Sequence, residues 1–203
     1  MSRYRRARTA GACYFFTVVA YRRHPILCDD AVHPARRDAI TRLRENRPFT
    51  IDAWVWLPVH LHCIWTLPSS DADYSTCWNM IERRVSVICS ADYRRPDGLT
   101  VSKRKHREST RWQRRFWEHP IHDEADFIRH VDYLHYNPVK HGLCPQAADW
   151  PHSRFHCYGA RGVYPAAWGG VDGDGVDVMA GEWIGVRFAW VRKMCPRYSA
   201  SLT

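Results

Sequence analysis

Residues 57–65 read Leu-Pro-Val-His-Leu-His-Cys-Ile-Trp, and they are the starting point for the fold that we expect. Side chains alternate between the two faces of a strand, so His60 and His62 point to one side. The apolar residues between and after them, beginning with Leu61 and Cys63, point to the other side and suit contact with helices. Two imidazoles about 7 Å apart along a strand are spaced to bind one metal ion, although an isolated pair can also be two half-exposed histidines without a ligand.

Hydrophobic patterns on either side of this strand predict the other elements. We expect strands at about 12–20, 50–57, 59–67 and 111–117, and helices at about 31–46, 74–90 and 123–136. The order strand, helix, strand, strand, helix, strand, followed by a further helix, predicts an α+β fold in which helices cover one face of an antiparallel sheet.

A second informative stretch lies at residues 132–143, which read Asp-Tyr-Leu-His-Tyr-Asn-Pro-Val-Lys-His-Gly-Leu. At 3.6 residues per turn, the helix that contains it has an apolar face with Phe127, Val131 and Leu134. Beside that face we predict a polar stripe made of Asp126, His130, Tyr133 and Asn137. Tyr136 is rotated away from the stripe, toward solvent or a bound partner.

The polar stripe has two interpretations. Pro138 disfavours helical geometry at the residue before it, so the Asn-Pro pair would end an ordinary amphipathic helix whose tyrosine covers the core. Alternatively, Tyr133 and Asn137 are neighbours at i and i+4, and the amide joins the two histidines in holding a divalent ion. Tyrosine is a weak nucleophile with a pKa of about 10, so its attack needs an activated electrophile such as a metal-bound phosphodiester.

Most of the formal net charge of +9 lies in one segment. Between residues 94 and 115, nine basic residues accompany two acids, and nine minus two leaves +7. We expect DNA phosphates to contact Arg94, Arg95, Lys103, Arg104, Lys105, Arg107, Arg111, Arg114 and Arg115, the alternative being a solvated loop without a partner. The aromatic side chains of Trp112, Phe116 and Trp117 either stack on bases or anchor the core, and we assign Trp112 to DNA binding.

Composition argues against several other classes of protein. The eight cysteines include no Cys-x-x-Cys pair, which argues against a zinc ribbon or a redox pair. No run approaches the roughly 18 apolar residues of a membrane span, and the apolar stretch after the basic N-terminus predicts a first strand rather than a signal peptide. We therefore expect a cytoplasmic, nucleoid-associated protein with no membrane partner.

At family level, His60-Leu61-His62 resembles the His-hydrophobic-His motif of the HUH nucleases. Three further stretches, 112–119, 132–143 and 149–155, resemble the REP-associated tyrosine transposases, which are relatives of the single-tyrosine insertion-sequence transposases. The resemblance runs from about residue 8 to residue 169 and its central motif is long and specific. Family members usually carry Asn or Asp just before the first histidine, where this chain has Val59.

The resemblance implies a ferredoxin-like fold with the two histidines on a central strand and Mg or Mn as the metal. Tyr133 matches the nucleophile, and Asn137 matches the third metal ligand after His60 and His62. Such enzymes cut single-stranded DNA beside a hairpin, a repetitive extragenic palindrome (REP), and form a 5′-phosphotyrosine. Relatives of this subgroup act as monomers, whereas insertion-sequence enzymes are dimers. The alternatives are a catalytically silent protein that binds DNA hairpins and an unrelated hydrolase of small phosphoesters.

We expect two regions along the chain. Residues 8–158 would form the catalytic domain, with the basic loop 94–110 inside it. Residues 159–203 would form a C-terminal extension, interrupted by a Gly/Asp-rich break at 169–177.

Overall fold

The computed structural model of the protein describes residues 8–89, 112–113, 115–165 and 167–170. The chain divides into two compact units. Unit 1 consists of Met1–Ile51 and Trp56–Pro120, and unit 2 of Asp52–Val55 and Ile121–Thr203. The expected catalytic domain thus contains parts of both units, and most of the expected C-terminal extension lies outside the described residues.

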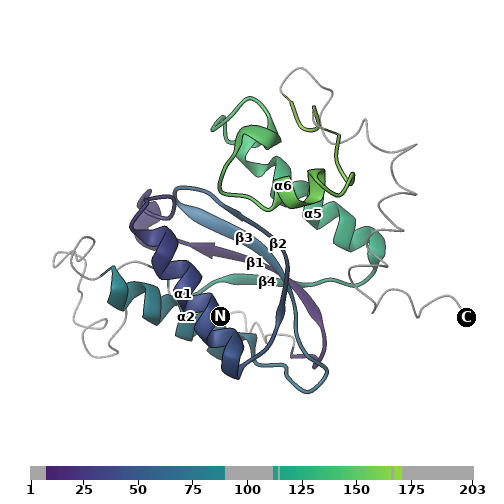
Figure 1. Ribbon diagram of the computed structural model, residues 1–203. Helices are drawn as coiled ribbons and strands as arrows, with labels where there is room; N and C mark the ends of the chain where they lie inside the picture. The colour runs from purple at the N-terminus through teal and green to yellow at the C-terminus, as the bar shows by residue number, and fades with distance from the viewer. Residues whose placement is uncertain (1–7, 90–111, 114, 166, 171–203) are drawn as a thin grey trace, which may run out of the picture. The chain divides into compact units, whose positions relative to one another are not determined.

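Unit 1 holds a four-stranded sheet with the order β2-β3-β1-β4, except that Asp52–Val55 of β2 are counted with unit 2 (Figure 1). The strands are β1 (Cys13–Val19), β2 (Thr50–Trp56), β3 (His60–Thr66) and β4 (Trp117–Pro120). Strand β1 is central and pairs antiparallel with both β3 and β4. Helices α1 (Val32–Asn46) and α2 (Tyr74–Ile88) lie side by side on one face, and a short 3-10 helix, η1 (Tyr21–Arg23), follows β1. The predicted ferredoxin-like α+β fold is confirmed.

Aromatic packing joins the sheet to α2. The ring of Trp65 on β3 stacks on Trp78 of α2, with centroids 4.3 Å apart. Phe16 on β1 contacts both rings, at 5.1 Å and 5.6 Å. Because Trp65 shares its strand face with Leu61 and Cys63, the apolar side of β3 lies under the helices, as the alternation of the sequence predicts.

The last strand of the sheet differs from the prediction. We expected a strand at 111–117, but β4 begins at Trp117, and its four residues pair with Tyr14–Thr17 of β1. Trp112 forms only an isolated bridge, to Ala20. All the aromatic residues in this region favour strands, and local preference does not say which of them pair with β1.

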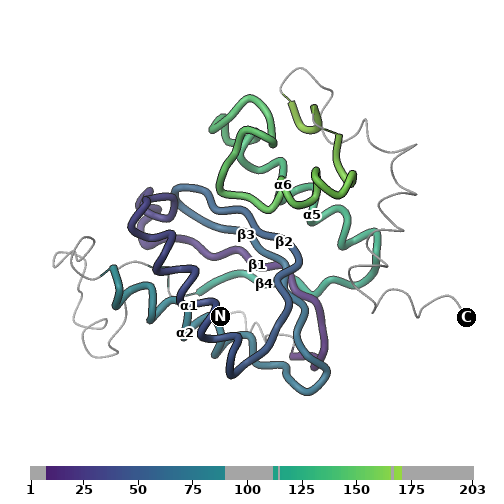
Figure 2. Tube along the Cα trace, viewed as in Figure 1, coloured from purple at the N-terminus to yellow at the C-terminus, as the bar shows by residue number. Residues whose placement is uncertain are grey.

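Unit 2 contains the long helix α5 (Glu124–Lys140), the 3-10 helix η3 (Ala147–Asp149) and the short helix α6 (Phe155–Gly159). The chain after α5 folds back within this unit, so η3 contacts both α5 and α6 (Figure 2). The carboxylate of Asp123 caps α5 by accepting a hydrogen bond from the Asp126 N–H at 2.7 Å. Phe127, Val131 and Leu134 are buried, which confirms the predicted apolar face.

Buried polar contacts hold the middle of α5 in unit 2. The Tyr164 hydroxyl donates to Asp132 at 2.7 Å, and His135 Nδ1 is hydrogen-bonded to the Ser153 hydroxyl at 3.0 Å. These two α5 residues flank Tyr133 in the sequence, so the backbone that carries the tyrosine is held on both sides. In the described part of the chain, no helix combines the length and the apolar character that crossing a membrane requires.

Candidate active site

The two histidines of β3 are the predicted site residues that lie in unit 1. Their rings lie edge to face, with centroids 4.8 Å apart, and both side chains are buried. The prediction that His60 and His62 point to the same side is confirmed. They lie on the face opposite Trp65, and therefore opposite α1 and α2.

Strand β1 orients the second histidine. Thr17 is paired directly with His62, and the Thr17 hydroxyl is 2.9 Å from His62 Nδ1. Phe15, two residues earlier, stacks on the same imidazole at 5.3 Å. If Nδ1–H donates to the hydroxyl, Nε2 carries the lone pair that binds a metal, which is the usual arrangement of a histidine ligand.

A cysteine lies next to the pair, and burial keeps it out of the chemistry. Cys63 points to the opposite face of β3, where burial raises the pKa of its thiol well above the usual value. A protonated thiol is a poor metal ligand and a poor nucleophile. The donor set that unit 1 offers from β3 is therefore two imidazole nitrogens without sulfur.

Helix α5, in unit 2, carries the other predicted site residues. Tyr133 is 40% exposed, and Lys140 Nζ lies 5.1 Å from the centroid of its ring. Asn137, one turn further on, is fully buried, and neither its Oδ1 nor its Nδ2 has a hydrogen-bond partner among the described residues. A buried amide without a partner is costly, which makes Asn137 a candidate ligand for a metal ion.

The helix continues through Pro138, which corrects the predicted end at residue 136. It extends to Lys140, and Pro138 and Val139 are both buried. Asn137 keeps its place in the hydrogen-bond ladder because its carbonyl accepts from the His141 N–H at 3.0 Å. The side chain of Asn137 therefore stays on the same stripe as Tyr133.

Tyr136 lies away from the stripe, as predicted, but it does not extend into solvent. Its ring is half-buried and lies edge-on to Trp168 at 6.4 Å. A Cβ on Gly169 would come within 3.4 Å of the Tyr136 ring, so this contact is close. Tyr136 is thus a packing residue of unit 2, and the more exposed tyrosine of the motif is Tyr133.

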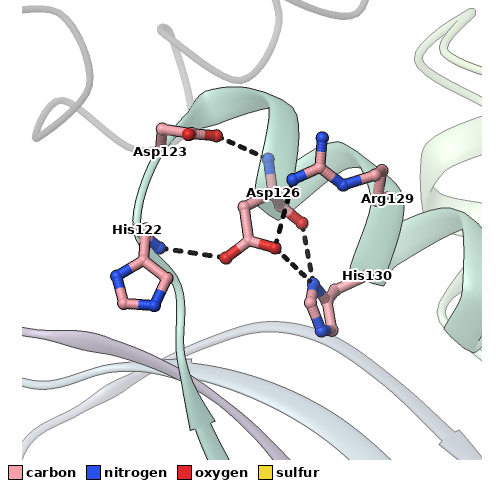
Figure 3. Close-up of polar contacts among 5 residues, drawn as sticks. All are labelled: His122, Asp123, Asp126, Arg129 and His130. Carbon is pink, nitrogen blue, oxygen red and sulfur yellow. Dashed lines mark hydrogen bonds and ion pairs between the residues drawn. The ribbon is translucent and has the colours of Figure 1, made fainter.

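A cluster around Asp126 has no role in the sequence-based prediction beyond its place on the polar stripe (Figure 3). The buried carboxylate accepts from the His122 N–H at 3.0 Å and from Arg129 at 3.5 Å. His130 Nδ1 lies 3.1 Å from Asp126 Oδ1 and 2.8 Å from the Asp126 carbonyl oxygen. The Asp-x-x-x-His spacing, which makes the two side chains neighbours on a helix, was the signal for this pair.

Comparisons with known proteins identify the family. No family model matches the chain. The REP-associated tyrosine transposase of Escherichia coli (strain K12) is 43% identical over 185 residues, which cover 91% of this chain and 99% of that protein. The chain therefore belongs to the REP-associated tyrosine transposases. A relative in Haemophilus influenzae is 38% identical over 84% of this chain and 94% of its own length.

A solved structure of a REP-associated tyrosine transposase bound to a REP hairpin has the same fold. It is 41% identical in sequence, with a TM-score of 0.70, and the match covers 87% of this chain and 96% of that one.

The structure of the present transposase also places the three aromatic residues whose role the sequence left open. Trp112 is buried and Phe116 packs against Phe16 at 5.9 Å, whereas Trp117 is 52% exposed.

Trp117 lies on the same face of the sheet as the histidine pair. It is paired with Thr17, which contacts His62, and its ring meets Phe15 edge-on at 5.9 Å. Most of the predicted DNA-binding residues of this transposase lie outside the described residues, namely Arg94, Arg95, Lys103, Arg104, Lys105, Arg107, Arg111 and Arg114. Arg115 is described and exposed, and the burial of Trp112 favours its alternative role as a core anchor.

Proposed function

We propose that this transposase cleaves and rejoins single-stranded DNA beside a hairpin, with Tyr133 as the nucleophile and a divalent metal as cofactor. The single observation that carries the proposal is on α5, where a fully buried amide without a hydrogen-bond partner among the described residues lies one turn from an exposed tyrosine. A helix that served only to pack would gain stability from an apolar residue at Asn137. Retention of the amide there supports a ligand role.

The proposed metal ligands are His60 and His62 from unit 1 and Asn137 from unit 2. Two imidazole nitrogens and an amide oxygen suit a divalent ion, either Mg or Mn, and imidazole generally favours the transition metal. A cation bound there would polarise the scissile phosphodiester and offset the charge that develops on it. The orientation of His62 by Thr17 supports this assignment, since ligand histidines are usually held through the other ring nitrogen.

Tyr133 would carry out the covalent step. Its hydroxyl oxygen attacks phosphorus, a Tyr–O–P bond forms, and the bond from phosphorus to the 3′ oxygen breaks. The products are a 5′-phosphotyrosine and a free 3′-hydroxyl. Attack by a 3′-hydroxyl on the phosphotyrosine reverses the step, so rejoining needs no external energy source.

Hairpin DNA is the proposed partner. The solved relative is bound to a REP hairpin, and this chain matches 96% of it. The basic residues between 94 and 115 would contact the phosphate backbone, and the exposed ring of Trp117 would meet a base of the single strand. These contacts would bring the DNA to the face of the sheet that carries His60 and His62.

The deciding experiment uses a labelled oligonucleotide that contains a hairpin with single-stranded flanks. Incubation with the protein and Mn should give a covalent protein–DNA adduct that survives denaturing gels. Tyr133→Phe should abolish the adduct and leave hairpin binding intact, whereas Tyr136→Phe serves as the matched control and should retain the adduct. Binding without any adduct would instead favour a catalytically silent hairpin-binding protein, and an adduct mapped to Tyr136 would overturn the assignment.

A further inference from the structure

We infer that His130 is the proton acceptor for Tyr133 and that Asp126 holds it in position, an inference that rests on the proposed role of Tyr133 as the nucleophile. A tyrosine hydroxyl must lose its proton as its oxygen attacks phosphorus. The polar stripe of α5 offers a histidine one turn before the nucleophile, backed by a buried carboxylate. The arrangement is that of an acid–base pair next to a nucleophile.

Helix geometry puts His130 and Tyr133 side by side. At about 100° per residue, positions three apart differ by about 60° around the axis and by about one turn along it. Side chains of a helix lean toward its N-terminus, so the Tyr133 ring leans over the turn that carries His130. The side chain of His130 is 20% exposed and that of Tyr133 is also accessible, so both can reach a bound DNA strand.

Asp126 fixes which nitrogen of His130 is basic. Its Oδ1 and its carbonyl oxygen lie 3.1 Å and 2.8 Å from His130 Nδ1, and both are acceptors, so Nδ1 must carry a hydrogen (Figure 3). In a neutral imidazole the lone pair is then on Nε2. The carboxylate is itself held, since Oδ2 accepts from the His122 N–H and the Asp126 N–H donates to Asp123.

The lysine beside the tyrosine cannot accept the proton while it is charged. Lys140 Nζ lies 5.1 Å from the Tyr133 ring centroid, but an ammonium group has only donors. In the proposed step the proton moves from the Tyr133 hydroxyl to His130 Nε2 while the Tyr–O–P bond forms. The departing 3′ oxygen takes a proton from water. On rejoining, His130 returns its proton to the tyrosine oxygen as the 3′-hydroxyl attacks, and water takes the proton of that hydroxyl.

The test measures the single-turnover rate of adduct formation on the hairpin oligonucleotide, using the full chain with saturating Mn. His130→Ala should slow the rate by roughly 100-fold or more, the usual contribution of a proton acceptor, with hairpin affinity unchanged. Added imidazole should restore part of the lost rate in His130→Ala and should not accelerate the wild type. His156→Ala removes an exposed histidine of α6 and is the matched control, with a wild-type rate.

Asp126 is a positioning residue, so its test is a double-mutant cycle. Asp126→Asn should slow adduct formation in the wild-type background and have little further effect once His130 is alanine. A carboxylate that only stabilised the fold would slow both backgrounds alike, and that result would remove Asp126 from the proposal.

The two proposals fail in different ways. An adduct on Tyr133 that forms at the wild-type rate in His130→Ala overturns the role of His130 alone. A slow His130→Ala variant that imidazole does not rescue has the same consequence, because the loss is then structural. No adduct in the wild type, or an adduct that persists in Tyr133→Phe, overturns the proposed function itself.

Discussion

Replacing Asn137 with leucine should make the protein more stable and, at the same time, inactive. The amide is fully buried, and neither of its polar atoms has a hydrogen-bond partner among the described residues. Leucine has the same number of side-chain non-hydrogen atoms, also branched at Cγ, and although its methyl groups are bulkier it leaves no polar atom to desolvate. A residue whose replacement stabilises the fold and abolishes the reaction is the signature of a group retained for function.

The size of the effect follows from the burial. A buried polar group without a partner costs about 1–3 kcal/mol, and leucine removes that cost. For a chain of this length, each kcal/mol shifts the melting temperature by about 2–4 °C. Leucine also has a better helix propensity than asparagine, by about 0.5 kcal/mol, and this gain must be subtracted from the measured change in stability. Asn79→Leu, at an exposed position of α2, measures the propensity gain alone and is the matched control.

Thermal denaturation followed by circular dichroism is the assay, run in chelator and in Mn. In chelator, Asn137→Leu should melt above both the wild type and Asn79→Leu. Mn at about 100 times its dissociation constant should stabilise the wild type by about 2.7 kcal/mol and the variant far less. A leucine variant that melts below the wild type in chelator would show that the amide has a structural partner, and the ligand assignment would then be wrong.

The remaining predictions concern the surroundings of the histidine pair and the DNA. Thr17→Val removes the hydroxyl that contacts His62 and should weaken Mn affinity by about 10–100-fold. The affinity is measured from the Mn dependence of adduct formation, and Thr50→Val, at an exposed position of β2, is the control. Trp117→Ala should weaken binding of single-stranded flanks by about 1–3 kcal/mol in a fluorescence titration, and unchanged affinity would exclude base stacking at this ring. The last change neutralises four basic residues, namely Lys103, Arg104, Lys105 and Arg107. It should lower the slope of log affinity against log salt by about 0.7 for each lost phosphate contact.

The periodicity of the sequence was sufficient to predict most of unit 1. Strict alternation in β3 separates the histidines from Leu61, Cys63 and Trp65, and each set lies on its expected face. The residues that form β4 could not be predicted from periodicity. Register is decided by pairing with β1 and not by local preference, so a run of strand-forming aromatic residues predicts a strand but not its partners.

For the candidate site, the sequence could predict which residues share one stripe of a helix or one face of a strand, but not their burial or their contacts. The spacing of Tyr133 and Asn137 on α5 is a local property and could be derived from 3.6 residues per turn. Complete burial of the Asn137 amide, and the contact of Thr17 with His62, depend on tertiary packing and β-strand pairing that no local pattern encodes. The Asp126–His130 pair could have been found by its spacing, but its hydrogen bonds could not.

The end of α5 explains why Asn137 keeps its position despite the proline after it. Pro138 donates no hydrogen bond, which on local grounds argues for an end at that point. Two residues after the helix, however, the Leu143 N–H donates to the Pro138 carbonyl and the Gly142 N–H to the Val139 carbonyl, each at 2.9 Å. Gly142 has φ +65°, so this is a Schellman cap, which closes the helix after Lys140. Because the cap and the burial of Pro138 hold the last turn together, the amide of Asn137 remains one turn from Tyr133, where the proposed chemistry requires it.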